Sequence, residues 1–412
     1  MDVAEHVGIV RSVDGNLPHI LNRISSHSKA LHAILPAGLA QAHRGNPIAA
    51  LGVEKLYGIP VLMSGTASLV LKQTEVNILN HHYKNTQRLL KIHDRSPDPV
   101  VYFLAGSLPA VATLHLKQLS LLSMISRLPD NILNKIGRHV LTVADDRTKS
   151  WFLMVRDICL LYQLPHPLSQ LDSPLPKEAA KQLFRAAVID YWETKLRTDA
   201  ALLPSLQYFK PQFMSLNCPH PIYQTCGSNS YEICKAIVQA KMVSGRYRTD
   251  RLVRHFYPDS DGNCSICPEN VPGTIEHILT QCPSLSETRE KLYEKLNTYN
   301  ISENAKSLIS TAIHSTNAND TVQFLLDCST TPEVISETQQ IGPVILEELF
   351  RYTRAWCYSI HKSRLKLQGR WTKQLIKIMP YFSPEATKPL SIMLFIFVKH
   401  MLMTMTEFDT IR

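Results

Sequence analysis

One short segment constrains the fold more than any other. It holds four potential metal ligands: Cys264, Cys267, His277 and Cys282. Three thiolates and one imidazole form the donor set of closed, tetrahedral structural zinc sites. Between residues 258 and 273 only Ile266 and Val271 are aliphatic, so local burial does little to order this loop. We therefore expect these four residues to bind one structural Zn²⁺ and to fold residues 258–297 around it.

The alternative interpretation is that Cys267 and Cys282 are small buried apolar side chains without a metal. The chain has 9 cysteines. An odd number, with no apolar signal segment at the start of the chain, indicates reduced thiols, and such a cluster then favours metal binding. We expect His277 and Cys282 to lie at the start of a helix that returns them to the Cys264–Cys267 turn.

The apolar residues recur mostly at helical spacing, which predicts a mainly α protein. Ser107 is the expected cap of one helix, with Pro109 in its first turn, and Ser284 with Glu287 is the expected capping box of another. Two short strands are expected at Pro60–Met63 and Val100–Phe103. The predicted helices are Leu17–Leu35, Val76–Ile92, Ser107–Ile125, Ser150–Tyr162, Glu178–Leu196, Ser230–Met242, Ser284–Leu296 and Pro343–Leu365.

A chain of 412 residues is expected to form two or three domains. Prolines collect between Leu164 and Lys177 and again between Pro204 and Pro221, where no helix can continue. We divide the chain into a helical region at 1–145, a helical linker at 146–215, a basic and cysteine-rich unit at 216–300, further helices at 301–366 and an atypical tail at 367–412.

The formal net charge is +9, and the excess is concentrated just before the cysteines. Lys235–Arg254 contains six basic residues and one acid, Asp250. Tyr247 and Tyr257 interleave with them and suggest base stacking. Such a segment is typical of sequence-tolerant contact with RNA or DNA, although a solvated helix face is the alternative. The residues expected to bind nucleic acid are Lys241, Arg246, Tyr247, Arg248, Arg251 and Arg254.

These motifs resemble the region after the polymerase domain in jockey-like and other LINE-type non-LTR retrotransposon reverse transcriptases. There a stretch like GRYRTD, here Gly245–Asp250, leads into a cysteine–histidine module. HVGIVRS, LYGIPVLMSGTASLVL, VYFLAGSLPAVATLHLKQLSLLSMI and SWFLMVRDICLLYQLP, all within residues 6–165, resemble that family's helical thumb and connection. The resemblance covers residues 6–366 in order and implies a thumb- and connection-like helical bundle, then a small Cys3His zinc module and further helices.

The resemblance also implies what is missing. Polymerases of this family hold two metal ions with palm aspartates, and the chain begins after the place where the palm should end. Asp145 and Asp146 lack the preceding aromatic residue and lie far downstream of the thumb-like segment, so we do not expect them to be catalytic. No nuclease motif follows Cys282. We therefore expect a non-catalytic remnant rather than an enzyme.

Two functions remain open at this point. The favoured one is a C-terminal remnant of a retrotransposon reverse transcriptase that binds Zn²⁺ and RNA or DNA, and the alternative is a zinc-clipped helical scaffold for protein–protein interaction. The longest apolar run, Leu390–Val398, is too short to span a membrane. We expect an intracellular protein, in the nucleus or the cytoplasm, with no membrane partner and no small-molecule substrate.

Overall fold

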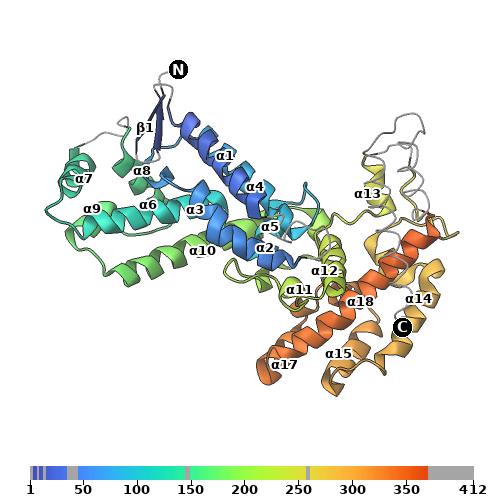
Figure 1. The fold of residues 1–412 in the computed structure, drawn as a ribbon. Helices are drawn as coiled ribbons and strands as arrows, with labels where there is room; N and C mark the ends of the chain where they lie inside the picture. Colours follow the sequence, from blue (N-terminus) through green and yellow to red (C-terminus); the bar gives the residue numbers. More distant parts are fainter. Residues whose placement is uncertain are drawn as a thin grey trace, which may run out of the picture.

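The structure is a computed structural model, and it describes residues 3–6, 9–12, 15–34, 45–143, 149–256 and 260–369. In this part of the chain the regular structure comprises 18 α-helices, short π- and 3₁₀-helical turns and one antiparallel hairpin (Figure 1). The hairpin pairs β1 (Val3–His6) with β2 (Ile9–Ser12). The prediction of a mainly α protein is confirmed.

The N-terminal half contains α1 (Leu17–Ile34), α2 (Pro47–Val53), α3 (Ile59–Leu62), α4 (Gln73–Thr86), α5 (Asp98–Ala105), α6 (Ala110–Ser126), α7 (Ile132–Val143), α8 (Trp151–Leu161), α9 (Pro167–Asp172) and α10 (Lys177–Ala201). A π-helical turn, η2 (Glu54–Gly58), joins α2 to α3. Shorter 3₁₀ turns are η3 (Thr66–Ser68), η4 (Gln87–Leu90), η5 (Pro204–Leu206) and η6 (Pro211–Phe213).

The C-terminal half contains α11 (Pro221–Gln224), α12 (Ser230–Val243), α13 (Asp250–Arg254), α14 (Ser286–Leu296), α15 (Glu303–Ile313), α16 (Ala318–Leu326), α17 (Pro332–Ile341) and α18 (Val344–Leu367). Between α13 and α14 lie a π-helical turn, η7 (His277–Gln281), and a 3₁₀ turn, η8 (Pro283–Leu285). The 3₁₀ turn η9 (Cys328–Thr330) precedes α17. Helix α18 packs along α12 and carries the fully buried Trp356 into the core.

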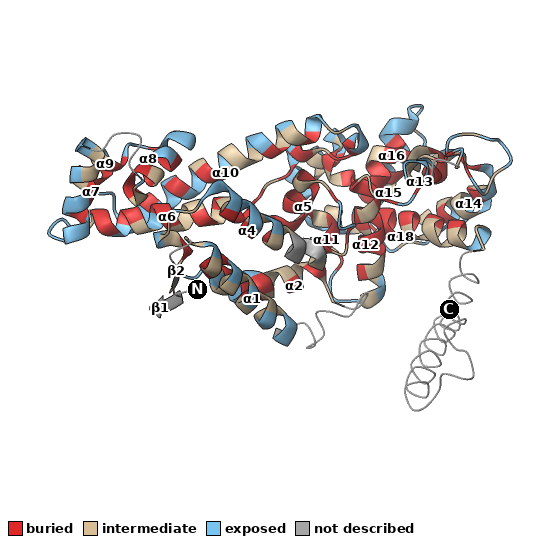
Figure 2. Cartoon of the chain, turned by 90° about the horizontal axis from the view of Figure 1, so that it is seen from above, coloured by how far each residue is buried: buried red, intermediate tan, exposed pale blue. Residues whose placement is uncertain are grey.

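The described residues form two apolar cores (Figure 2). The smaller core lies among α6, α8, α9 and α10 and includes Leu119, Val155 and Phe184. The larger core extends from Leu62 to Ile360. These cores do not by themselves define domain boundaries, so the five predicted units stay a prediction.

Both predicted strands are wrong, because these segments are helical. Val100–Phe103 lies in α5, where all four side chains are buried. When a short helix is buried on every side, its sequence is apolar throughout. Such a sequence cannot be distinguished from that of a buried strand by its periodicity. Pro60 belongs to α3, and Met63 is the residue that ends it. The hairpin β1–β2 was not predicted.

Three predicted helix starts have different outcomes. Ser150 caps α8, because its side chain accepts a hydrogen bond from the backbone nitrogen of Phe152. The predicted cap Ser107 is wrong, since α6 begins after Pro109 and has no side-chain cap. The predicted capping box is also wrong: Ser284 Oγ donates to the carbonyl of Ile266 instead, 2.6 Å away.

No single helix in the described ranges is long and apolar enough to cross a membrane; α5 and α6 together meet that criterion, as a pair bent by 60°.

Candidate metal centre

The four predicted metal ligands meet at one point. The ligand atoms of Cys264, Cys267, His277 and Cys282 all lie within 4.8 Å of one another. Cys264 Sγ lies 3.9 Å from Cys282 Sγ, and Cys267 Sγ lies 3.4 Å from His277 Nε2. Tetrahedral ligands at normal metal–sulfur and metal–nitrogen bond lengths are about 3.5–3.8 Å apart. These four residues therefore form a Cys3His group at metal-binding distance.

A tight hairpin positions the first two cysteines. The backbone nitrogen of Cys264 donates to the carbonyl of Val271 at 2.8 Å, and that of Gly273 donates to Gly262 at 3.0 Å. Gly262 has a φ of +77°, in the left-handed region that glycine adopts without strain. The hairpin thus turns the chain so that both thiols face the same side.

The other two ligands lie at opposite ends of η7, His277 as its first residue and Cys282 directly after its last. The nitrogen of Cys282 donates to the carbonyl of His277 at 2.7 Å, which closes this turn. Helix α14 begins four residues later, at Ser286. The expectation of a helix start is therefore met at His277 but wrong for Cys282, and the single turn brings the imidazole and the thiol to one side.

The protonation of the group fits a divalent metal. Burial raises the pKa of the Cys267 thiol, and burial together with the neighbouring Cys264 raises the pKa of Cys282 to about 12. Burial lowers the pKa of His277, so its imidazole is neutral at pH 7 and can donate a lone pair. Thiolates 3.9 Å apart repel each other unless a cation lies between them. A thiophilic divalent cation supplies that compensation.

Asp250 connects the cysteine hairpin to helices α13 and α18. Its carboxylate accepts hydrogen bonds from the backbone nitrogen and the hydroxyl of Ser265, at 3.3 and 3.2 Å, and from Arg364 Nη2 at 3.2 Å. Arg364 Nη1 also donates to the carbonyl of Arg248 at 2.7 Å, and Gln368 Nε2 donates to Ser265 Oγ at 2.8 Å. The hairpin is therefore fixed to the rest of the protein beside the metal ligands.

These anchoring residues were not identified from the sequence as part of the site. Asp250 was noted only as the one acid in a basic segment, and Arg364 and Gln368 lie more than 100 positions from their partners. An acid directly after a run of arginines was the only available signal.

Helix α13, which carries Arg251 and Arg254, lies beside this module (Figure 1). The side chains of Arg248, Arg251 and Arg254 are exposed, whereas Lys241 and Arg246 are partly buried. The backbone nitrogen of Arg251 donates to Gly273 at 3.3 Å, and Arg254 Nη1 donates to the carbonyl of Asp261 at 3.3 Å. The metal hairpin thereby fixes the helix that carries two of the arginines.

Tyr247 does not offer the exposed ring that base stacking requires. Its side chain is only 8% exposed, and its hydroxyl lies 2.8 Å from His361 Nδ1. The guanidinium of Arg364 lies over its ring, 5.7 Å from the centroid. Tyr247 is a core residue, and Tyr257 lies outside the described residues. Contact of the remaining basic residues with nucleic acid stays a prediction.

No second cluster of potential metal ligands forms in the part of the chain that the structure describes. The Cys3His group is the one set of three or more potential ligands found there. His220 instead pairs with Asp327, Nε2 to Oδ2 3.1 Å, and both side chains are buried. Asp145 and Asp146 lie outside the described residues.

Nothing in the sequence indicated that buried His27 and Glu54 connect to the half-buried His82. His27 Nε2 lies 2.7 Å from Glu54 Oε1, and His27 Nδ1 lies 2.9 Å from His82 Nε2. His82 lies 55 positions from His27, so local sequence carried no signal for this contact.

Comparison with known proteins yields no relative: no family model, no curated protein and no solved structure matches the chain.

Proposed function

We propose that the protein binds one structural Zn²⁺ and uses the adjoining arginines to bind RNA or DNA without marked sequence preference. The observation that carries the proposal is that the Cys3His group and α13 share one support, the carboxylate of Asp250. Zinc bound by the group would order the hairpin, and the hairpin would fix the orientation of Arg251 and Arg254. Exposed guanidinium groups on a fixed edge are suited to phosphate contacts.

Zinc is the metal that this donor set favours. Three thiolates and an imidazole with no vacant ligand position give the closed tetrahedral coordination of structural zinc. In this role the ion supplies folding free energy, and it activates no water. The resemblance to the region after a LINE-type polymerase agrees with such a role, and we propose that origin on the motifs alone. We propose no catalytic activity for this chain.

The test of zinc binding is elemental analysis of protein purified without chelator, followed by cobalt substitution. One equivalent of zinc and a cobalt spectrum of three thiolates in tetrahedral geometry are expected. Protein that is free of metal, with circular dichroism unchanged by chelator, contradicts the proposal.

The test of nucleic-acid binding is a salt titration with single-stranded RNA. Replacing Arg248, Arg251 and Arg254 by Ala should weaken binding and flatten the salt dependence. The matched control removes three exposed lysines from α10, namely Lys177, Lys181 and Lys195. If the lysine substitutions weaken RNA binding more than the arginine substitutions do, the contact lies on α10 instead. If the parent protein does not bind RNA at low salt, the second candidate function, described below, is favoured.

The second candidate is a helical scaffold for protein–protein interaction. It is favoured by α7, which buries Asn134 and Gly137 and leaves Ile132, Ile136 and Val143 on the surface, the last two exposed by 44% and 67%. An apolar helix face that points outward is typical of interaction surfaces. Here too the zinc would act only as a structural clip.

A further inference from the structure

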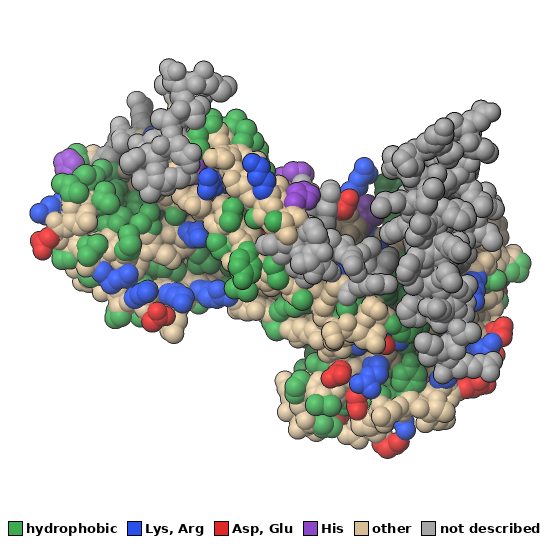
Figure 3. All heavy atoms as spheres, viewed as in Figure 1, with side chains coloured by type: hydrophobic (Ala, Val, Ile, Leu, Met, Phe, Trp, Pro, Cys, Tyr) green, Lys and Arg blue, Asp and Glu red, His purple; other side chains and the backbone are tan. Residues whose placement is uncertain are grey.

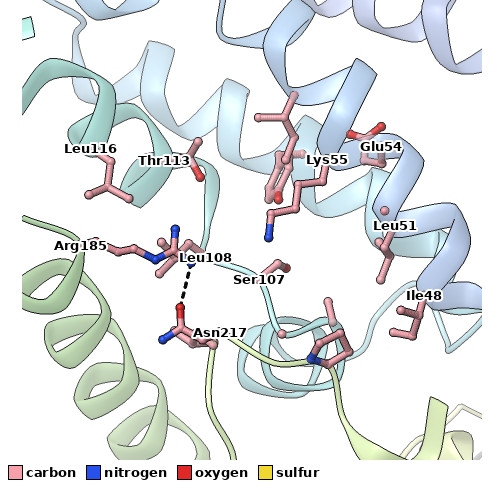
Figure 4. A pocket seen from close by; sticks show the side chains of 17 residues that line it. Ile48, Leu51, Glu54, Lys55, Ser107, Leu108, Thr113, Leu116, Arg185 and Asn217 are labelled. Carbon is pink, nitrogen blue, oxygen red and sulfur yellow. Dashed lines mark hydrogen bonds between the residues drawn. The ribbon is translucent and has the colours of Figure 1, made fainter. Parts of the chain in front are cut away.

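The N-terminal half contains a cavity of about 340 Å³. Its walls come from α2 and η2, from the α5–α6 turn and the start of α6, from α10, and from the segment before α11 (Figure 4). Most of the wall is apolar, formed chiefly by Ile48, Leu51, Ile59, Leu108, Leu116 and Leu216. The cavity lies at the lower end of the range that holds small ligands, roughly 300–1,000 Å³.

Two cations converge on this cavity. Figure 4 shows Lys55 and Arg185 extending into it from opposite sides. Arg185 is held by Asn217, with Nη2 2.9 Å from Oδ1. Among the described residues neither cation has an acidic partner within ion-pair distance. Their charges are therefore available to a ligand.

The one acid in the wall is directed away from the two cations. Glu54 Oε1 accepts a hydrogen bond from His27 Nε2 at 2.7 Å, and Oε2, which is buried without a hydrogen-bond partner, lies against Gly58, where an added Cβ would be 2.2 Å away. The carboxylate thus faces His27 and Gly58 rather than Lys55. A ligand in the cavity would meet positive charge and apolar surface.

The turn between α5 and α6 adds a polar group to the wall. Ser107 lies in this turn, lines the cavity and has a buried hydroxyl without a hydrogen-bond partner. A buried hydroxyl without a partner is unfavourable, and an anionic ligand would satisfy it.

The cavity wall is preformed. Gly106 has a φ of +57°, and a Cβ there would lie 2.2 Å from the carbonyl carbon of Cys218. This close approach, with the hydrogen bond from His220 N to Leu104 O at 3.1 Å, fixes the segment of Asn217 against the α5–α6 turn. Binding would therefore need little rearrangement.

We propose that this cavity binds a small amphipathic anion, a carboxylate or phosphate monoester on a short apolar body. The anionic group would lie between Lys55 and Arg185, near Ser107, and the apolar body against the leucines. A row of Lys and Arg side chains along the edge formed by α10 would attract such anions (Figure 3). This inference is independent of the zinc module and departs from the expectation of no small-molecule ligand.

The experiment is calorimetric titration of the full chain with decanoate, decyl phosphate and decanol, each below its aggregation threshold. We expect both anions to bind with one site per chain and decanol to bind at least tenfold more weakly. The anion that binds with the higher affinity identifies the preferred head group. Lys55→Gln and Arg185→Gln should each weaken anion binding about tenfold, because each removes one charged contact.

The matched control is Lys177→Gln, which removes the same charge from α10 two turns before Arg185 and away from the cavity. It should bind within about twofold of the parent, well below the roughly tenfold loss expected for Lys55→Gln and Arg185→Gln. Equal binding of decanol, equal binding by all variants, or no binding at millimolar ligand would each overturn the proposal.

Discussion

Asp250 is the residue on which the metal module and the helical core both depend. Its side chain is 9% exposed and accepts hydrogen bonds from the cysteine hairpin and from the buried guanidinium of Arg364. A buried carboxylate and guanidinium stabilise the fold only as long as both are present, because either one alone is an uncompensated buried charge.

We therefore predict that Asp250→Asn destabilises the protein by about 3 kcal/mol or more, because Arg364 keeps its charge without a counterion. Urea denaturation of the metal-loaded protein measures this free energy. The control is Asp130→Asn at an exposed turn, which should change stability by about 0.5 kcal/mol or less. Equal effects of the two substitutions would show that the Asp250–Arg364 pair contributes little.

The metal ligands give a second prediction at this scale. Cys264→Ser should abolish stoichiometric zinc binding, since a hydroxyl is a poor replacement for a thiolate in a Cys3His site. Cys234→Ser removes a thiol outside the cluster and should leave one zinc per chain. Elemental analysis of both variants measures the zinc content per chain. Loss of zinc in both would indicate a general folding defect.

The pH dependence of zinc affinity follows from the protonation of the same residues. Burial raises the pKa of Cys267 and Cys282 in the metal-free protein, so zinc must displace thiol protons at pH 7. Each displaced proton lowers the apparent affinity about tenfold per pH unit of acidification. His277, whose pKa is lowered, adds no proton near neutral pH. Competition with a chromophoric chelator between pH 8 and 6 should show affinity falling steeply as pH falls.

At the scale of elements, the exposed arginines around α13 are held by the hairpin beside them. If Arg248, Arg251 and Arg254 each contact one phosphate, replacing all three by Ala should reduce the slope of log K against log salt by about 2 to 2.7. Fluorescence anisotropy with labelled RNA at several salt concentrations measures the slope. An unchanged slope would show that these arginines do not contact the RNA phosphates.

The turn between α5 and α6 allows a test of how closely two elements pack. Gly106→Ala should destabilise the protein by more than 2 kcal/mol, because the left-handed conformation and the contact with Cys218 both oppose a Cβ. Gly227 has a similar φ of +61° with open space around it, so Gly227→Ala should cost only about 1 kcal/mol. Thermal or urea unfolding measures the stability of the two variants. Equal losses of stability would mean that the backbone near Cys218 can move to accommodate the added Cβ.

At the scale of the whole molecule, the metal module is continuous with the larger core. Cys264, Cys282, Ile278 and Leu279 belong to the same buried cluster as Trp356. Loss of the ion should therefore weaken packing well beyond the loop that holds it.

We predict that removing zinc with a chelator lowers the melting temperature reported by Trp356 by about 10 °C or more, since tight binding to the native state adds several kcal/mol to its stability. The transition reported by Trp151, which packs against the smaller core, should shift less. Single-tryptophan variants separate the two signals. A metal-independent Trp356 transition would show that the larger core is stable without the ion.

The sequence alone determined the helical class and the residues of the Cys3His group. Helical periodicity is a local property of the chain, and four ligands within 264–282 need only one hairpin and one turn to meet. For the same reason the extents of α1, α8 and α18 could be predicted within a few residues. The start of α6 was misplaced because Ser107, a good local cap, is taken into a cavity wall.

Only the tertiary structure decided which residues support these sites. The burial of Tyr247, the pairing of Asp250 with Arg364 and the joining of His27 to Glu54 all depend on side chains brought together from distant parts of the chain. The helical character of Val100–Phe103 was decided in the same way, by neighbours that bury it on every side. The cavity between Lys55 and Arg185 exists because α2, α6 and α10 pack around it. Such contacts are a property of the packed molecule, and no local pattern encodes them.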